Sequence, residues 1–405
     1  MCRLGRCPNT SDGLAEADLT ETNASFVRAG KSFLRDLVLP RPSAGMPKLP
    51  DGAPLVVAGM FRTGSGLGRA AISCFEALQH ENLRPIAVDL STPFNQVDLQ
   101  THLPLAPFPG GAQGTLILLT NPPEVPAALK VLGLRRWHNW RIVACWVWEL
   151  SFVPEAWRDA EKFVSEIWAP SRFVAEAFRV HFDRPVKVVP HFIAVPKLPQ
   201  ASSSDTLRLL ALADARSSLE RKNPLAAARM FKAAFCDGMS VELTIKCRNL
   251  DLYPDYAAEL LESIGGDPRI RLIRETLFAE AQFELLKSCD ILLSPHRAEG
   301  FGVPLAEAMA LGKYVIATGW SGNLEFMDAE CAVLLPSKLI PAEDRTGVYP
   351  PALGAVWAEP DFDAGVEALR SAAATPERRH AFRTAGPAAI SARLGPGAYA
   401  RALGT

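Results

Sequence analysis

Two glutamates, Glu299 and Glu307, have seven residues between them in the segment RAEGFGVPLAEAMA. The glycines on either side of Phe301 predict a tight loop that approaches a ligand, and Pro304 suits the first turn of a helix, where its missing N–H costs nothing. Glu299 is therefore expected on a loop and Glu307 in the first helical turn. Carboxylates are poor neighbours for phosphates but accept hydrogen bonds from hydroxyls. Glu307 is thus a candidate to bind the hydroxyls of a ribose, and Glu299 a hydroxyl of a second sugar.

Backbone groups and a histidine belong to the same prediction. The N–H groups of Gly300, Phe301 and Gly302 are expected to point at the same place, and His296 is a candidate to face the sugar. A second interpretation assigns no ligand to the segment. In it, Glu307 complements the positive end of the helix, Glu299 is exposed and the histidine is an ordinary loop residue.

A basic loop, DARSSLERKN, lies between a predicted strand and a predicted helix. It contributes Arg216, Arg221 and Lys222, and the helix after it is expected to begin with Asn223 as cap and Pro224 in the first turn. Cations next to free backbone N–H groups make a site for a diphosphate. The alternative is a solvated loop.

Two further loops carry small or glycine-rich sequence. ATGWSGNLEF follows a predicted strand and offers hydrogen-bonding groups at Thr318, Ser321, Gly322 and Asn323, or it is a plain strand-to-helix turn capped by Ser321.

FRTGSGLGR contains Gly64, Ser65 and Gly66, but Arg69 follows Gly68, so the spacing G-x-G-x-x-G of a dinucleotide fingerprint fails. Asp89 ends the next predicted strand, near where a ribose-binding acid of such a fold is expected. These residues support an alternative function, a nicotinamide-dependent oxidoreductase.

Parallel strands with helical crossovers must position these loops, because short apolar runs alternate with helical segments from Leu55 onward. PLVVAGM, PIAVDL, TLILLT, RIVACWVW, LRLLALA, VELTIKC, DILLSP and KYVIAT are predicted strands. The pattern predicts two doubly wound α/β domains in series. The expected parts are an N-terminal extension (1–50), a first domain (51–197), a linker (198–206), a second domain (207–375) and a C-terminal helical tail (376–405).

Composition narrows the class of protein. The 405 residues include 43 basic and 44 acidic ones, which gives no sign of a nucleic-acid partner. Eight cysteines without a CxxC pair argue against a zinc ribbon and a disulfide scaffold and favour a reducing, cytoplasmic location. No D-x-D-like acidic pair is placed to hold a metal ion at the diphosphate.

The segment EGFGVPLAEAMALGKYVIATGWSGNLEF resembles the signature of retaining glycosyltransferases of family 4, which have the GT-B fold. EIWAPSRFVAEAF, VKVVPHF and ERKNPLAAARMF extend the likeness, which runs from about Leu55 to about Pro360. WVWEL, SRFVAEAF, ERKNP and SGNLEF are most similar to bacterial polysaccharide mannosyl- and related hexosyltransferases. The resemblance implies two Rossmann-like, doubly wound domains that face a cleft. The first would lie on the acceptor side, and the second would bind a nucleotide-sugar in the cleft.

The resemblance also implies roles for residues. Glu299 would bind the donor sugar near its 3-hydroxyl, Glu307 the ribose, and Lys222 the diphosphate leaving group. The Gly-Phe-Gly backbone would hold donor hydroxyls or phosphate, and the loop Gly64 to Gly68 would lie over the diphosphate near the acceptor.

Two positions depart from the family pattern. The family usually has an arginine where this sequence has Ser217, and Arg216 and Arg221 are the candidates to replace it. The family commonly has a histidine on the first-domain loop that faces the donor, where this sequence has WVWEL. Glu149 is the nearest polar candidate there, or it simply ends a core strand.

The implied activity is transfer of a hexose, mannose favoured and glucose next, from a GDP- or UDP-hexose. The acceptor would be a glycan or a polyprenol-linked glycan in cell-surface polysaccharide synthesis, with peripheral contact at the inner face of the cytoplasmic membrane. The nucleotide-sugar is a co-substrate, and no metal or other cofactor is expected. Besides the oxidoreductase, the alternatives are a GT-B sugar-nucleotide epimerase and a catalytically degenerate GT-B binding protein.

Overall fold

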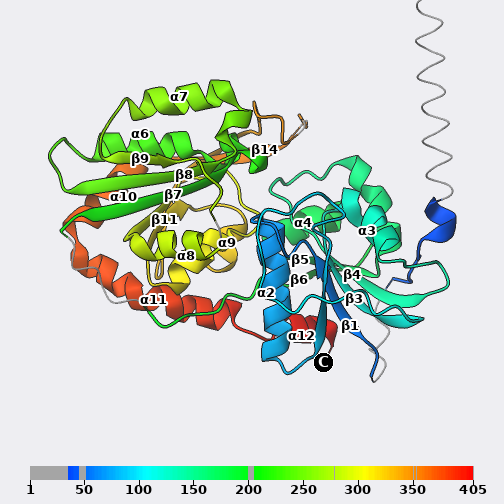
Figure 1. The fold of residues 1–405 in the computed structure, drawn as a ribbon. Coiled ribbons are helices and arrows are strands. Elements are labelled where there is room, and N and C mark those ends of the chain that lie inside the picture. The colour runs from blue at the N-terminus through cyan, green and yellow to red at the C-terminus, as the bar shows by residue number, and fades with distance from the viewer. Residues whose placement is uncertain are drawn as a thin grey trace, which may run out of the picture.

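The computed structural model describes residues 35–44, 52–198, 205–277, 279–349, 351–352 and 354–404. Within them the chain forms two α/β domains that lie side by side (Figure 1). Most of the expected extension and most of the expected linker fall outside the described residues. Residues 35–38 form a helical turn, and the carbonyl of Val38 accepts a hydrogen bond from the backbone N–H of Arg136 in the first domain (2.8 Å).

The first domain is a six-stranded parallel sheet in the order β2-β1-β3-β4-β5-β6. Its strands are β1 (Leu55–Gly59), β2 (Pro85–Asp89), β3 (Gln113–Leu119), β4 (Asn139–Cys145), β5 (Glu166–Ala169) and β6 (Val186–Val188). Its helices are α2 (Gly66–His80), η1 (Pro122–Glu124), α3 (Val125–Val131), η2 (Glu155–Phe163) and α4 (Arg172–His181). Every residue of β1 is buried, as expected for a strand covered on both faces.

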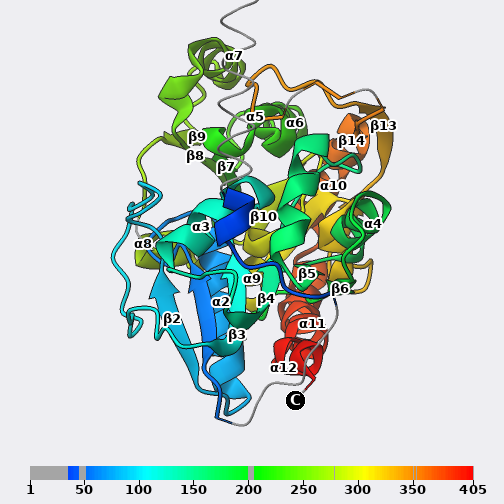
Figure 2. The same ribbon diagram turned by 90° about the vertical axis from the view of Figure 1, so that its right-hand side faces the viewer.

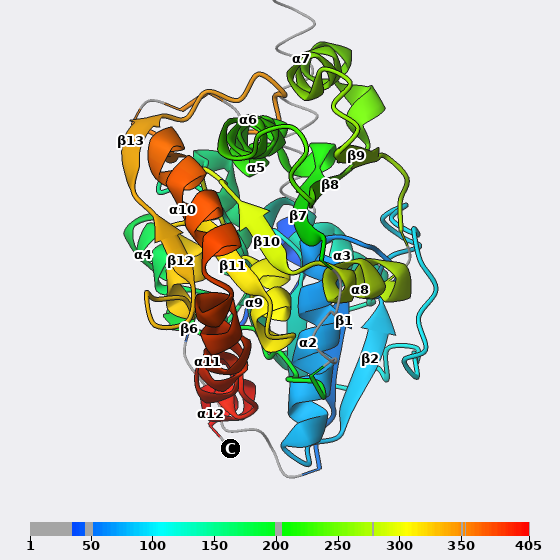
Figure 3. The ribbon, with the colours of Figure 1, turned by 90° about the vertical axis from the view of Figure 1, so that its left-hand side faces the viewer.

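The second domain is another six-stranded parallel sheet, in the order β12-β11-β10-β7-β8-β9 (Figure 3). Its strands are β7 (Leu207–Asp214), β8 (Val241–Arg248), β9 (Ile270–Ile273), β10 (Ile291–Ser294), β11 (Tyr314–Thr318) and β12 (Val333–Leu335). Its helices are η3 (Ala215–Ser217), α5 (Leu219–Lys222), α6 (Pro224–Ala234), η4 (Leu250–Leu252), α7 (Pro254–Ile264), α8 (Ala279–Ser288), α9 (Val303–Ala310), η5 (Gly322–Glu325) and α10 (Phe362–Ala374). The expected fold class, two doubly wound parallel α/β domains, is confirmed.

An antiparallel pair of strands, β13 (Ser337–Pro341) and β14 (Val356–Pro360), lies beside the second sheet (Figure 2). The backbone N–H of Ala358 in β14 donates to the carbonyl of Arg297 (2.9 Å), so the pair supports the loop after β10. No pattern in the sequence had predicted these strands.

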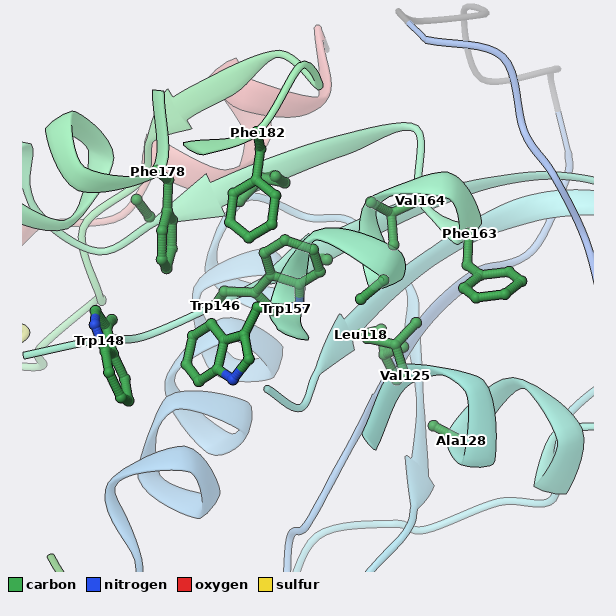
Figure 4. Packing of buried hydrophobic residues seen from close by; sticks show 14 of the residues in the cluster. Leu118, Val125, Ala128, Trp146, Trp148, Trp157, Phe163, Val164, Phe178 and Phe182 are labelled. Atoms are coloured by element: carbon green, nitrogen blue, oxygen red, sulfur yellow. The ribbon is translucent and has the colours of Figure 1, made fainter. Parts of the chain in front are cut away.

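Aromatic side chains fill much of the first domain's core (Figure 4). Trp146 packs edge to face on Phe178, with ring centroids 6.1 Å apart, and Trp148 packs on Trp157 at 4.5 Å. Trp148 also contacts Tyr349 of the second domain, at 5.2 Å. The core of the first domain therefore continues into the second, through the WVWEL segment.

The C-terminal end of the chain runs along the second domain as α11 (Pro376–Leu394) and returns to the first domain as α12 (Ala398–Leu403), which packs on α2 (Figure 1). The buried Arg141 guanidinium donates to the carbonyl of Leu403 (3.0 Å), and the ammonium of Lys187 donates to the carbonyl of Ala402 (2.9 Å). Two cations thus cap the carbonyl end of α12, where the helix dipole favours positive charge. No helix among the described residues is long and apolar enough to cross a membrane.

Candidate active site

The predicted site loops meet at one edge of the second sheet. Strands β11, β10 and β7 are neighbours in the sheet and run parallel, so their carboxyl ends lie together. Three loops leave those ends, at residues 214–223, 295–302 and 319–323. In a doubly wound sheet this edge is where ligands bind.

Glu299 is the centre of a buried ion cluster. Its side chain is 9% exposed, with Oε1 2.5 Å from Nζ of Lys222 and Oε2 3.2 Å from Nη1 of Arg221. Burial by itself would raise the pKa of Glu299, but the charges of Lys222 and Arg221 outweigh it and lower this pKa to about 2. Glu299 is therefore held as a carboxylate at the tip of the loop.

Left-handed backbone at Asn223 directs Lys222 toward this carboxylate. Asn223 (φ 53°) ends α5 and begins α6, and its side chain accepts a hydrogen bond from the N–H of Ala226 (3.3 Å). Asparagine tolerates this conformation better than most residues. The predicted cap at Asn223 and the predicted first-turn Pro224 are both observed.

Arg221 is 2% exposed and serves the loops themselves. Its guanidinium donates to the carbonyls of Ser217 (3.0 Å) and Ala298 (2.8 Å) as well as pairing with Glu299. Glu149 of the first domain approaches the same guanidinium at 3.7 Å and accepts a hydrogen bond from the hydroxyl of Tyr349 (2.7 Å). Glu149 thus joins the cluster from across the domain interface.

Arg216, the other candidate to replace the family arginine, has an exposed side chain. Its backbone N–H donates to the carboxylate of Asp214 (3.1 Å). Arg221 is thus committed to buried carbonyls, whereas the side chain of Arg216 faces outward.

Glycines let three chain segments approach closely at Gly300. A Cβ on Gly300 would lie 2.6 Å from Cγ1 of Val147, and one on Gly322 would lie 2.1 Å from the carbonyl oxygen of Gly300. The carbonyl of Gly300 accepts a hydrogen bond from the hydroxyl of Ser171 at the start of α4 (2.7 Å). The Gly-Phe-Gly loop therefore packs against the first domain on one side and against the 319–323 loop on the other.

Ser321 ties the two loops of the second domain together. The N–H of Glu299 donates to its hydroxyl oxygen (2.8 Å), and the N–H of Gly322 donates to the carbonyl of Glu299 (2.8 Å). Ser321 has φ 79°, a strained value for a residue with a side chain. Gly302 (φ 92°) caps α9. These bonds fix the direction in which Glu299 leaves the loop.

His296, Asn323 and Thr318 are fully buried beneath that loop. Nε2 of His296 lies 3.3 Å from Oδ1 of Asn323, whose amide donates to the carbonyl of Thr318 (3.0 Å). Burial lowers the pKa of His296, so the ring is neutral. Phe301 is also buried, between the rings of His191 and Phe326. A contact between His296 and a sugar stays a prediction.

Glu307 lies in the second turn of α9, not in the first as expected, because the helix already begins at Val303. It faces a cavity of about 180 Å³ between the domains. The cavity is lined by α2, by residues 191–196 and by Phe283 and Val303. The Glu307 carboxylate forms an ion pair with Arg69 of α2, across the interface. The sequence had singled out Arg69 only as the residue that breaks the dinucleotide fingerprint, because no pattern in one chain segment shows which residue of the other domain will face it.

The glycine-rich loop of the first domain also reaches the second domain. A Cβ on Gly64 would lie 2.9 Å from Nη1 of Arg248. Ser65 caps α2, its hydroxyl accepting from the N–H of Gly68 (3.3 Å), while a Cβ on Gly66 would meet nothing within 4 Å.

Asp89, the acid on which the oxidoreductase alternative depends, binds side chains at the base of this loop. Oδ2 of Asp89 lies 2.8 Å from Nε of Arg62, and Oδ1 accepts from the hydroxyl of Ser91 (2.6 Å). The described residues contain no group of three or more His, Cys, Asp or Glu side chains that could hold a metal ion.

Residues 225–344 match the family model described as Glycosyl transferases group 1. The matched segment runs from α6 through the Glu299 loop, α9 and the 319–323 loop. No match to the sequence is found among curated proteins.

Solved structures share the fold at low sequence identity. Sucrose-phosphate synthase from Thermosynechococcus elongatus has a TM-score of 0.58 and 15% identity, over 87% of this chain and 97% of that one. HepE from Anabaena, in complex with UDP-glucose, has a TM-score of 0.57 and 15% identity, over 86% and 98%. TarM from S. aureus, in a complex that includes UDP, has a TM-score of 0.52 and 11% identity over 71% of this chain, which spans only 54% of the TarM chain.

The match in the second domain confirms the resemblance that the Glu299 segment carries, and the solved structures confirm the two-domain architecture. The chain therefore has the GT-B fold, and its second domain matches the group 1 glycosyltransferases.

Proposed function

We propose that the protein is a retaining hexosyltransferase that uses a GDP- or UDP-hexose as donor, with mannose favoured and glucose next. The proposed acceptor is a lipid-linked glycan or an oligosaccharide in cell-surface polysaccharide synthesis. With such an acceptor the protein would work in the cytoplasm, in peripheral contact with the inner face of the membrane. The UDP and UDP-glucose in the HepE and TarM structures support including UDP donors beside GDP-mannose.

The observation that carries this proposal is the cluster of Glu299 with Lys222 and Arg221. A buried carboxylate accepts hydrogen bonds only, so Glu299 suits sugar hydroxyls. Lys222 is the cation of the cluster that keeps partial exposure, at 17% of its side chain, and it can turn to an arriving diphosphate. Two neighbouring loops thus supply Glu299, which accepts hydrogen bonds from hydroxyls, and Lys222, which donates to phosphate oxygens.

The proposed mechanism is a front-face displacement. The bond between the anomeric carbon and the diphosphate oxygen breaks, and the acceptor oxygen forms a bond to the same carbon on the same face. The proton of the acceptor hydroxyl passes to an oxygen of the departing diphosphate, so no side-chain base is required. The protein's part is to stabilise the charge that develops on the diphosphate, with Lys222 and backbone N–H groups.

A thermal-shift panel of GDP, UDP, ADP and dTDP with their hexose conjugates tests the donor. A ligand present at about 100 times its Kd should add about 2.7 kcal/mol to the free energy of unfolding. Transfer or slow hydrolysis of the stabilising conjugate, measured as release of the nucleoside diphosphate, then tests the reaction. A Glu299→Gln variant should lose turnover with that conjugate. Absence of stabilisation by every member of the panel would count against the proposal.

Three simple results distinguish the alternatives. Quenching of NADH fluorescence by the pure protein would favour the oxidoreductase. Isomerisation of a free nucleotide-sugar without acceptor would favour the epimerase. Stabilisation by a nucleotide-sugar with no transfer or hydrolysis would favour a degenerate binding protein.

A further inference from the structure

Two buried cations, Lys246 and Arg248, lie on the same face of β8. Alternate residues of a strand point to the same side of its sheet, and Cys247 between them faces the core formed with α6 and α7. Lys246 is 5% exposed and Arg248 is 7% exposed. Neither belongs to the Glu299 cluster or to the motifs that identify the family.

Where the chain is described, carboxylates pair with Arg248 but not with Lys246. Arg248 is bound by Asp214 at 2.6 Å, and the carboxylate of Asp98 in the first domain lies 3.9 Å from its guanidinium. Lys246 makes no hydrogen bond and no ion pair with the described part of the chain. Burial and the neighbouring Arg248 lower the pKa of Lys246 to about 8, although Asp214 raises it. Nζ of Lys246 is not among the fully buried unpaired atoms of the described residues, so an anion that enters between the domains can reach it.

Arg248 faces the glycine-rich loop of the first domain. Gly64 is in contact with the Arg248 guanidinium, so closely that a Cβ there would lie 2.9 Å from Nη1. Asp98 supports the same loop, because it accepts a hydrogen bond from the hydroxyl of Thr63 (3.0 Å). In Figure 3, β7 and β8 lie above the first domain. Arg248 is thus at the interface between the domains, and Lys246 lies two residues before it on the same face of β8.

The pair also flanks the loop that carries the basic residues. Strand β7 lies between β10 and β8, so the Lys222–Glu299 pair lies on one side of the β7 loop and Arg248 on the other. Asp214, the last residue of β7, is paired in register with Arg248, the last residue of β8. Cations therefore approach this loop, and the position of Ser217 within it, from both sides.

We propose that Lys246 and Arg248 form an anion site for the diphosphate of the donor, with Arg248 supplying the cation that the family has at the position of Ser217. This inference rests on the proposed function for the identity of the anion. Asp214 and Asp98 hold the Arg248 guanidinium in place. When the diphosphate binds, it replaces Asp98 as a partner of the guanidinium. Arg248 touches the donor in this arrangement, whereas Arg221 remains a buried support of the loops.

Isothermal titration of the full chain with inorganic pyrophosphate, UDP and GDP tests the site. Arg248→Gln and Lys246→Met should each weaken the binding of the diphosphates by at least tenfold. Arg269→Gln is the matched control, because Arg269 also pairs with an aspartate (2.7 Å to Asp267) but lies just before β9, at the opposite end of the sheet. The control should bind as the wild type does.

Each outcome separates this inference from the proposed function. Variants that bind within twofold of the wild type overturn the site, as does a wild type that binds none of the three diphosphates. Weakened binding in a protein that transfers no sugar supports the site and removes the hexosyltransferase. If Arg248→Gln does not fold, the Lys246→Met variant decides, since Lys246 has no partner whose loss would unfold the protein.

Discussion

Replacing Lys222 by methionine tests how much the ion cluster around Glu299 contributes to the stability of the protein. In the folded protein the pKa of Glu299 is about 2, against its usual 4.5, and this difference corresponds to about 3 kcal/mol in favour of the carboxylate. Lys222 provides the shorter of the two contacts to cations, at 2.5 Å against 3.2 Å. Its removal should therefore cost about 1–3 kcal/mol of unfolding free energy at pH 7.

The same substitution should change the pH dependence of stability in a definite direction. The folded-state pKa of Glu299 lies below its unfolded value, so its contribution is present above pH 4.5 and is lost as the pH falls toward 2. In Lys222→Met this pKa should rise toward 4.5, because one of the two cations is gone. The variant should then lose less stability than the wild type between pH 4.5 and 3.

Urea unfolding at several pH values measures both effects, and turnover with the donor found in the thermal-shift panel measures the catalytic one. Loss of one preorganised charge stabiliser typically costs about 2–4 kcal/mol in the barrier, which is roughly 30- to 1000-fold in turnover. Lys232→Met is the control, since that lysine donates to the carbonyl of Ser263 (3.0 Å), away from the cluster. A Lys222→Met enzyme with wild-type turnover and wild-type acid stability would refute the role given to the cluster.

Three further predictions concern stability, each measured by chemical denaturation. Gly300→Ala places a Cβ 2.6 Å from a first-domain side chain and should cost about 1–3 kcal/mol, whereas Gly66→Ala, with nothing within 4 Å, should cost under about 1 kcal/mol; equal effects would contradict the close approach. Arg141→Met leaves the buried Glu166 with one cation fewer and should cost about 3–5 kcal/mol, and a loss under 1 kcal/mol would show that the return of α12 does not depend on it. Burial lowers the pKa of His191 to about 4 from 6.5, so stability should fall by up to about 3 kcal/mol as the pH drops from 6.5 toward 4. A His191→Gln variant should flatten that part of the profile, and an unchanged profile would refute the assignment.

Local patterns in the sequence predicted the elements well, because their causes are local. The alternation of apolar runs and helical segments corresponds to the two parallel sheets. Caps such as Ser171 and Asn223 appear where side chains that accept a backbone N–H precede a helix. The sequence predicted that the loops of Lys222 and Glu299 lie at the same edge of a sheet, but it did not predict that the two side chains form an ion pair.

Contacts between the domains could not be predicted in the same way. Arg69 on Glu307 and Gly64 on Arg248 depend on how two separately folded units pack, which no periodicity in one segment encodes. The burial of His296 likewise depends on which side of its loop turns inward. Lys246 lies inside a predicted strand, where a lysine ordinarily indicates a solvent-facing position.

Among the described residues, two segments that join the halves of the molecule touch each other: the segment near residue 193 and the end of α11. The N–H of Ile193 donates to the carbonyl of Leu394 at 3.1 Å. Two joining segments that lie side by side act as a hinge. Rotation of the domains about this hinge is easier than sliding or complete separation. Opening for a bulky substrate would therefore be widest at the rim farthest from the hinge, and cutting the chain after Leu394 would remove one of the two joining segments.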